Sequence, residues 1–182
     1  EDGMSDTDER RAWGEAVLVK DKEGKVVNKY YVNNKFGYAN ATTGVADMIN
    51  MRAEEMLITL AECKCRKGEY ADARALLEEL YAKRYTATRD ISSLTDSDEV
   101  SLDTHMAPVT LIDEILLQRR IELWCEGMGR VPDLRRLNLG YSRSEQQSEP
   151  TDAKPNDPRF ILKIPLKEFD SHTALDIAKD QN

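Results

Sequence analysis

The pattern of apolar and polar residues predicts one long helix between positions 111 and 126. Six large apolar side chains recur every three or four positions and form two stripes. These are Ile112, Leu116 and Leu123 in one stripe and Leu117, Ile121 and Trp124 in the other. Residues at this spacing share a helix face, so we expect about four turns buried on more than one side. Thr110 is placed to cap the first turn with Asp113 as the capping-box acid, and Gly127 and Gly129 to end the helix.

Charged residues lie between the two apolar stripes of this helix. Arg119, Arg120, Glu122 and Glu126 follow one another within eight positions. Because both flanks are apolar, we do not expect all four side chains to be free in water. Glu122 and Glu126 are predicted to pair locally or to contact another helix through their carboxylates.

A second apolar pattern predicts a pair of helices over residues 46–84. Asp47 is a candidate cap, and the first helix has an apolar face that continues through Lys67: Ile49, Ala53, Met56, Leu57, Leu60 and Ala61. Gly68 ends it, and a second face runs to Arg84: Tyr70, Ala73, Leu76, Leu77, Leu80 and Tyr81. The spacing resembles a tetratricopeptide unit, in which small residues such as Ala61 and Ala73 allow close approach and Tyr70 packs between the helices.

The remaining segments are predicted to be a hairpin and two long loops. Residues 16–20 and 26–32 are rich in strand-forming residues and flank a turn that contains Gly24. Residues 85–108 and 142–159 have no period, and three prolines exclude a helix from the second loop. Phe160, Leu162 and Ile164 then alternate like an edge segment of a sheet, which Pro165 ends.

Composition narrows the class of protein. The 182 residues are 40% hydrophobic and 33% charged, and the mean hydropathy of -0.62 is too low for a membrane-spanning helix. The net charge of -8 leaves no basic stripe for phosphates, so we expect no nucleic-acid partner.

Catalytic and metal-binding residues find little support in the sequence. Cys63, Cys65 and Cys125 show neither a metal-ligand spacing nor a disulfide pattern, and we interpret them as three small buried thiols. His105 and His172 lie in polar segments without a spaced partner. The sequence therefore predicts no catalytic residue, no metal site and no cofactor.

Aromatic residues near the hairpin are the best candidates for ligand binding. Trp13, Tyr31 and Tyr38 have asparagines close by, Asn33 among them. A flat ring can cover the apolar face of a sugar while amides bind its hydroxyl groups. Ordinary packing of these aromatics beneath the hairpin is the alternative interpretation.

Four stretches, in chain order, resemble one protein family. The clearest combines Arg119-Arg120-Ile121-Glu122-Leu123-Trp124, Glu126-Gly127 and Asp133-Leu134-Arg135-Arg136-Leu137-Asn138. The others are the approach segment with Asp8, Arg10, Trp13, Lys35 and Phe36, the helix pair with Arg52, and the closing Ile164-Pro165 followed by Glu168. Together they are similar to the SusD/RagB-like family of outer-membrane nutrient-binding lipoproteins of Bacteroidetes. Cys125 stands where a glycine is common.

The resemblance implies a mainly α, SusD-like helical fold with one tetratricopeptide-like helix pair, a small β-hairpin and long loops. Its expected parts are residues 1–45 with the hairpin and approach segment, 46–84 with the helix pair, 109–140 with the signature helix and a short helix, and 141–182 with a loop and the edge segment. Arg52 is expected to pair with acids of the signature helix.

The implied function is not enzymatic. It is capture of a glycan or other oligomeric nutrient at the cell surface, in partnership with a SusC-like TonB-dependent outer-membrane transporter. The chain begins at Glu1 without a signal stretch or an early cysteine. It is therefore expected to be the C-terminal part of a lipoprotein whose lipid anchor lies further toward the N-terminus. A tetratricopeptide-type adaptor for a protein or peptide is the alternative function, and a secreted hydrolase is a third.

Overall fold

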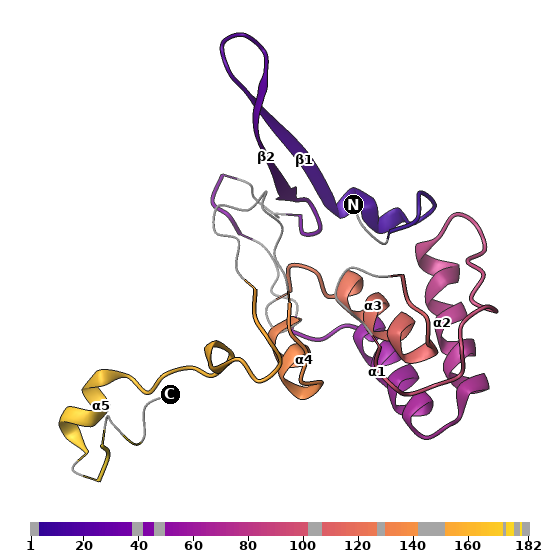
Figure 1. Cartoon of the computed structure of the whole chain (residues 1–182). Helices are drawn as coiled ribbons and strands as arrows, with labels where there is room; N and C mark the ends of the chain where they lie inside the picture. The colour runs from indigo at the N-terminus through magenta and orange to yellow at the C-terminus, as the bar shows by residue number, and fades with distance from the viewer. Residues whose placement is uncertain are drawn as a thin grey trace. The chain divides into compact units, whose positions relative to one another are not determined.

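The computed structural model describes residues 4–37, 42–45, 50–101, 107–126, 130–141, 152–172, 174–176 and 179. The fold is mainly α, as the sequence predicts (Figure 1). The chain divides into two compact units, Glu1–Arg130 and Val131–Asn182. The division falls inside the stretch 109–140 that the sequence pattern groups together. Within the described residues, no helix has the length and apolar content needed to cross a membrane.

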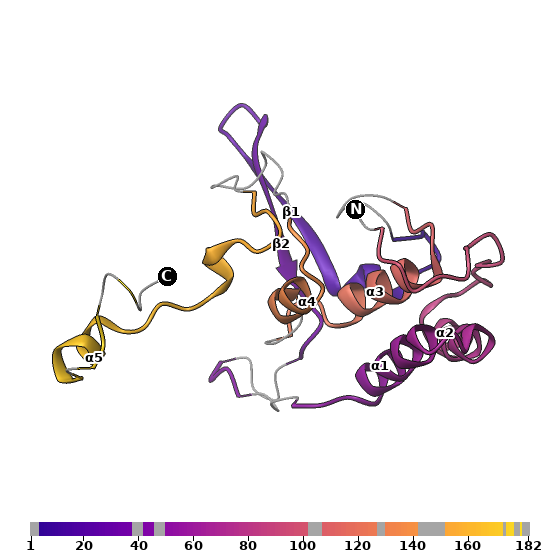
Figure 2. The same ribbon diagram turned by 60° about the horizontal axis from the view of Figure 1, so that its bottom comes forward.

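Helices α1 (Ala53–Arg66) and α2 (Tyr70–Arg84) form the predicted pair, and α3 (Leu111–Glu122) packs against both (Figures 1 and 2). The turn between α1 and α2 requires a left-handed residue, which Gly68 supplies with a φ of 75°. The predicted core face of α2 is confirmed, because Ala73, Leu77, Leu80 and Tyr81 are all buried.

The predicted core face of α1 is confirmed at Ala61 but wrong at Met56 and Leu60. The helix begins at Ala53, after an extended Arg52, and its buried residues are Ile58, Ala61, Glu62 and Cys65. Met56 is 45% exposed and Leu60 48% exposed. The period is helical, as predicted, but the face that meets α2 and α3 is rotated from the one assigned, and period alone does not fix this rotation. Asp47 lies outside the described residues.

Helix α3 is buried on more than one side, as predicted. The hydroxyl oxygen of Thr110 accepts a hydrogen bond of 3.2 Å from the backbone N–H of Asp113, which confirms the cap. Asp113 does not complete a capping box. Its buried carboxylate instead accepts a hydrogen bond of 3.0 Å from the backbone N–H of Ser101 and so attaches the preceding loop to the helix.

The helix ends earlier than the sequence suggests. Its last residue is Glu122, and Leu123 caps it. Trp124, predicted to lie on a core face, follows the helix and is 37% exposed. Cys125 has a φ of 60°, a conformation in which a β-carbon is unfavourable. The backbone therefore favours glycine at position 125, where this sequence has cysteine in place of the glycine that is common in the family it resembles.

Strands β1 (Gly14–Lys20) and β2 (Val26–Asn33) form the predicted antiparallel hairpin, drawn in Figure 1 as a long ribbon. It follows a short 3-10 helix, η1 (Glu9–Trp13). The Asp21 carboxylate accepts hydrogen bonds from the backbone N–H groups of Glu23 and Lys25, and Gly24 has a φ of 83°. These contacts account for the turn chemistry that the sequence indicates.

The loop after α2 is irregular, as predicted, but it is attached to the helices. The Arg74 guanidinium donates hydrogen bonds of 2.6 Å and 2.7 Å to the carbonyl oxygens of Ile91 and Leu94. Ile91 is 7% exposed. Thr95 pairs with Thr110, immediately before α3 begins.

The second unit contains most of α4 (Arg130–Arg136), then η2 (Pro158–Phe160) and α5 (Leu166–Ser171). The predicted edge segment at Phe160, Leu162 and Ile164 is wrong. Residues 161–165 are irregular, and Leu162 is 92% exposed. Pro158 and Pro165 bracket this stretch, and neither can donate a backbone hydrogen bond to a neighbouring strand.

The left-handed turn between α1 and α2 gives a stability prediction. We expect Gly68→Ala to lower the free energy of unfolding by about 1 kcal/mol, because a β-carbon at positive φ is strained. Gly37→Ala is the control, since neither glycine has an atom within 4 Å of an added β-carbon and only Gly68 has a positive φ. Urea unfolding of both variants checks this, and equal effects would contradict a conformational origin.

Candidate functional site

A stripe of polar residues runs along the buried side of α3. Glu114, Gln118 and Glu122 stand four positions apart, and each is 0% exposed. A buried carboxylate is costly unless cations and hydrogen bonds compensate its charge. The partners of these three residues therefore determine which other segments pack against the helix.

Glu122 binds arginines from three separate segments. Arg84, from the end of α2, donates to both carboxylate oxygens at 2.8 Å and 3.0 Å. Arg52, just before α1, donates at 2.8 Å, and Arg10, from η1, at 3.2 Å. The paired geometry of Arg84 is the strong form of a guanidinium–carboxylate contact. One carboxylate thus connects η1, α1, α2 and α3.

The contacts continue past the C-terminal end of α3. Arg52 donates hydrogen bonds of 3.0 Å and 2.6 Å to the Glu126 carboxylate and one of 2.8 Å to the carbonyl oxygen of Glu122. Lys35, which follows the hairpin, donates to the Glu122 carbonyl and to the Glu126 carboxylate. Cations at a helix C-terminus satisfy free carbonyl groups and match the helix dipole. The prediction that Arg52 pairs with acids of this helical segment is confirmed.

The N-terminal half of α3 makes a matching set of contacts. The Glu114 carboxylate accepts hydrogen bonds from the Tyr81 hydroxyl at 2.6 Å, from Arg89 at 2.9 Å and from Gln118 at 2.8 Å. Gln118 in turn accepts a hydrogen bond of 2.6 Å from Arg10. Arg10 therefore joins the Glu114 and Glu122 ends of the stripe. The Arg10 guanidinium also donates hydrogen bonds to the Asp8 carboxylate at 2.7 Å and to the Tyr85 hydroxyl at 3.1 Å. We call these residues the α3 charge network: Asp8, Arg10, Lys35, Arg52, Tyr81, Arg84, Tyr85, Arg89, Glu114, Gln118, Glu122 and Glu126.

The electrostatics of the α3 charge network keep the carboxylates of Glu122 and Glu126 ionised. Burial raises the pKa of Glu122, but hydrogen bonds from Arg84 and Arg52 and the charges of Arg84 and Arg10 lower it to about 2. Burial also raises the pKa of Glu126, and hydrogen bonds from Arg52 and Lys35 lower it below its ordinary value. A general acid or base works best with a pKa near the working pH. Glu122 and Glu126 therefore hold the helices together and are unsuited to proton transfer.

The sequence predicted only part of this network. It indicated Glu122, Glu126 and Arg52, but it did not indicate Lys35, Arg84 and Arg89 as their partners or Glu114 and Gln118 as buried. The spacing of four between the polar residues of α3 is the signal that could have found the last two, because apolar residues surround them.

Three of the four predicted ligand residues, Trp13, Tyr31 and Asn33, lie on or beside the hairpin. Trp13 is half-buried, with the Lys35 ammonium 4.5 Å and the Arg84 guanidinium 5.7 Å from its ring centre. Asn33 is exposed, and its side chain accepts a hydrogen bond of 2.9 Å from the backbone N–H of Lys35. Tyr31 pairs with Ala16 in the hairpin, and Tyr38 lies outside the described residues. Cation contacts with the Trp13 ring connect this residue to the α3 charge network.

The cysteines differ from the prediction of three buried thiols. Cys65 is buried, and burial raises the pKa of its thiol to about 11. Cys63 and Cys125 are exposed. Cys63 and Cys65 lie on opposite sides of α1, as their spacing of two on a helix requires.

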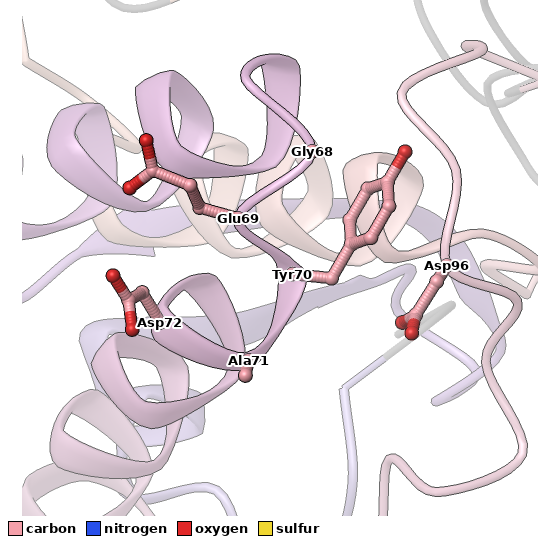
Figure 3. A pocket seen from close by; sticks show the side chains of 6 residues that line it. All are labelled: Gly68, Glu69, Tyr70, Ala71, Asp72 and Asp96. Atoms are coloured by element: carbon pink, nitrogen blue, oxygen red, sulfur yellow. The ribbon is translucent and has the colours of Figure 1, made fainter.

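One hollow lies at the turn between α1 and α2 and measures about 430 Å³. Its lining residues are labelled in Figure 3: Gly68, Glu69, Tyr70, Ala71, Asp72 and Asp96. Glu69 and Asp72 point to one side of the chain there, and both pair with Lys64. The Tyr70 ring lies on the opposite side, near the loop that carries Asp96 (Figure 3). The acids on the Lys64 side are therefore already paired within the protein.

A second hollow, of about 310 Å³, lies within the second unit. It is lined by one aromatic, two aliphatic and four polar or charged residues: Phe160, Leu134, Ile161, Arg135, Asn138, Asn156 and Asp157. The Phe160 ring packs against the ring of Tyr141, with centroids 5.8 Å apart. A hollow of this size is at the lower end of the range for small-molecule sites, roughly 300–1,000 Å³.

The helix-turn-helix pair α1 and α2, with α3 packed against it and a hairpin before it, defines a tetratricopeptide-like helical class of protein. The family model of the SusD family matches residues 15–170 of the chain. The chain therefore belongs to the SusD family, as the motifs in its sequence predict.

A solved structure shows the same fold. It is the crystal structure of a SusD-like carbohydrate binding protein from Bacteroides vulgatus, with a TM-score of 0.68 and 22% sequence identity. The superposition covers 94% of this chain and 39% of that chain, so this chain spans about two fifths of the length of that protein. A comparison with curated proteins gives no match.

The α3 charge network gives a stability prediction for Glu122. Replacing it by glutamine leaves Arg10, Arg52 and Arg84 without their shared negative charge, which we expect to lower the free energy of unfolding by about 3–5 kcal/mol. Glu78→Gln, at an exposed position of α2, is the control and should change it by less than about 0.5 kcal/mol. Urea unfolding at pH 7 measures both, and similar small losses would show that the network does not stabilise the fold.

The same residue gives a prediction about pH. The pKa of Glu122 falls from its ordinary value of 4.5 to about 2 in the folded protein. Its ionised form therefore stabilises the fold fully above pH 4.5, and this contribution is lost as the pH falls from 4.5 towards 2. Unfolding curves in this range should show a steeper loss of stability for the natural protein than for Glu122→Gln. Parallel losses would contradict the lowered pKa.

Proposed function

We propose that this chain belongs to a cell-surface protein that binds a glycan and delivers it to a TonB-dependent outer-membrane transporter. The observation that carries the proposal is the family match over residues 15–170. The likeness in fold to a SusD-like carbohydrate binding protein supports it. The nutrient is an oligosaccharide, and the protein stays at the outer membrane through a lipid anchor outside this chain.

We propose that the protein binds without catalysis. The buried carboxylates of α3 are the acids of this chain with the most distinctive environment, and cations and hydrogen-bond donors surround them. A hydrolase that acts on sugars needs one carboxylic acid that is protonated at the working pH. The lowered pKa values of Glu122 and Glu126 argue against that role for either residue.

Within such a protein, we assign the first unit mainly a scaffold role. The α3 charge network fixes the hairpin base against three helices, which holds Trp13, Tyr31 and Asn33 on a defined support. We keep Trp13, Tyr31, Tyr38 and Asn33 as proposed glycan contacts. An aromatic ring on a rigid base can stack on a sugar with little loss of side-chain entropy.

A glycan array on the whole protein, followed by calorimetric titration, tests the proposal. We expect an oligosaccharide to bind, and Tyr31→Ala to weaken its affinity by about threefold to tenfold, as for the loss of one aromatic contact. Tyr31→Phe is the matched control, because it keeps the ring and removes only the hydroxyl group. Trp13→Ala, Tyr38→Ala and Asn33→Ala extend the series, and a thermal melt of each variant separates binding from stability.

The outcomes separate the alternatives. If an oligosaccharide binds and its affinity is unchanged by all four alanine substitutions, glycan capture stands and these four contacts are wrong. If no glycan binds while a peptide or protein binds tightly, the tetratricopeptide-type adaptor replaces the proposed function. Release of reducing sugar from a bound glycan would contradict the non-catalytic role.

A further inference from the structure

The second hollow combines an apolar wall with polar groups that have no partner in the described part of the chain. Phe160, Ile161 and Leu134 form the apolar part. Among the described residues, the side chains of Arg135, Asn138 and Asn156 make no hydrogen bond or ion pair. Polar side chains that line a hollow without internal partners are available to a ligand.

Both asparagines hold left-handed backbone positions that frame the hollow. Asn138 has a φ of 53° directly after α4, where the backbone N–H of Leu139 donates a hydrogen bond of 2.8 Å to the carbonyl oxygen of Leu134. This is a common way for a helix to end, and glycine and asparagine are the residues that fit it. Asn156 has a φ of 59° in a turn closed by a 3.1 Å hydrogen bond from the Asp157 N–H to the Lys154 carbonyl oxygen.

The charges around the hollow leave one cation uncompensated. Asp157 accepts hydrogen bonds of 2.9 Å and 2.7 Å from the guanidinium of Arg159 and one of 2.9 Å from its backbone N–H. Its negative charge is therefore balanced within η2 and the preceding residue. Arg135 lines the same hollow, is exposed and pairs with no carboxylate among the described residues. Of the two charged side chains that line the hollow, Arg135 is therefore the one that a ligand can pair with.

A rigid contact supports the aromatic wall. The Phe160 ring packs against the ring of Tyr141 at an interplanar angle of 59°. Tyr141 in turn exchanges backbone hydrogen bonds of 2.9 Å and 2.8 Å with Ala153. Gly140 makes this approach possible, because a β-carbon there would lie 2.3 Å from the Ala153 carbonyl oxygen. The wall is thus held by contacts within the second unit.

We infer that this hollow is a subsite for one acidic pyranose residue of a glycan, with the ring on Phe160, the hydroxyl groups on Asn138 and Asn156, and the carboxylate on Arg135. The inference rests on the proposed glycan-binding function and specifies its ligand class. A guanidinium binds a carboxylate through two parallel hydrogen bonds, which a neutral hydroxymethyl group cannot reproduce. The volume of about 310 Å³ suits one sugar ring and excludes a long segment.

Two matched oligosaccharides test this subsite on the whole protein by calorimetric titration. Trimers of galacturonic acid and of galactose differ only in a carboxylate against a hydroxymethyl group on each ring. We expect the acidic trimer to bind about tenfold more tightly, the size of one charge-assisted hydrogen-bonded contact. Arg135→Gln should abolish this preference. Lys167→Gln, which removes an exposed charge from α5 of the same unit, should leave it unchanged.

The asparagines allow a substitution that does not disturb folding. Asn138→Gly and Asn156→Gly remove the amide but keep the left-handed backbone, so we expect the melting temperature to hold or rise while the affinity for the acidic trimer falls about fivefold. If some glycan binds but none of the Arg135, Asn138 and Asn156 variants changes its affinity, the subsite is wrong and glycan capture stands. Equal affinity for the two trimers also overturns the acidic preference. Failure of every glycan to bind overturns both proposals.

Discussion

The first unit depends on one buried negative charge, the Glu122 carboxylate. Arginines from η1, from the start of α1 and from the end of α2 reach it across sequence separations of 112, 70 and 38 residues. Removing either side of such a contact leaves an unpaired charge inside the protein, which costs far more than the pair gains over an apolar substitute. The contact therefore favours one arrangement of the segments, because any other arrangement leaves a buried charge without a partner.

The rest of the α3 charge network extends the same requirement along the helix. Gln118 links Arg10 to Glu114, and Glu114 holds Arg89 and Tyr81. At the other end, Lys35 connects the segment after the hairpin to the last carbonyl groups of α3. Apolar burial around Ile112, Ile115 and Leu116 supplies a driving force that has no direction. Hydrogen bonds between charged groups depend on distance and angle, so they fix which segments meet. Apolar burial and these hydrogen bonds together place the hairpin base beside the helix pair.

Local patterns in the sequence predicted the helices and the hairpin of this fold. The features that the sequence could not predict depend on contacts between residues far apart in the chain. The hairpin turn, the Thr110 cap and the left-handed Gly68 are set by residues a few positions apart. The exposed Met56 and Leu60 show that a helical period leaves the direction of the buried face open. The apolar stripe predicts that Trp124 lies in the core. The stripe continues past Glu122, however, and the helix ends there.

The candidate site was harder to predict than the fold for the same reason. Family resemblance pointed to Glu122, Glu126 and Arg52 and included Lys35 without a role, whereas no pattern in the sequence singled out Arg84. Asn138 comes from one segment and Asn156 and Phe160 from another, and no spacing in the sequence relates them. The sequence carries a partial signal for the two asparagines. Asn138 follows a helix and Asn156 follows a proline, and asparagine is common at such positions with positive φ.

The two units use their polar residues in different ways. In the α3 charge network, carboxylates and guanidinium groups satisfy one another within the protein, so a ligand that displaced one contact would have to replace several. At the hollow of the second unit, Asn138 and Asn156 hold left-handed backbone positions, and their amides and the Arg135 guanidinium have no partner among the residues that the structure describes. A polar group that the fold has already satisfied offers a ligand little free energy, whereas an unpaired donor beside an apolar wall offers both affinity and selectivity. This contrast supports the scaffold role proposed for the first unit and the sugar subsite inferred in the second.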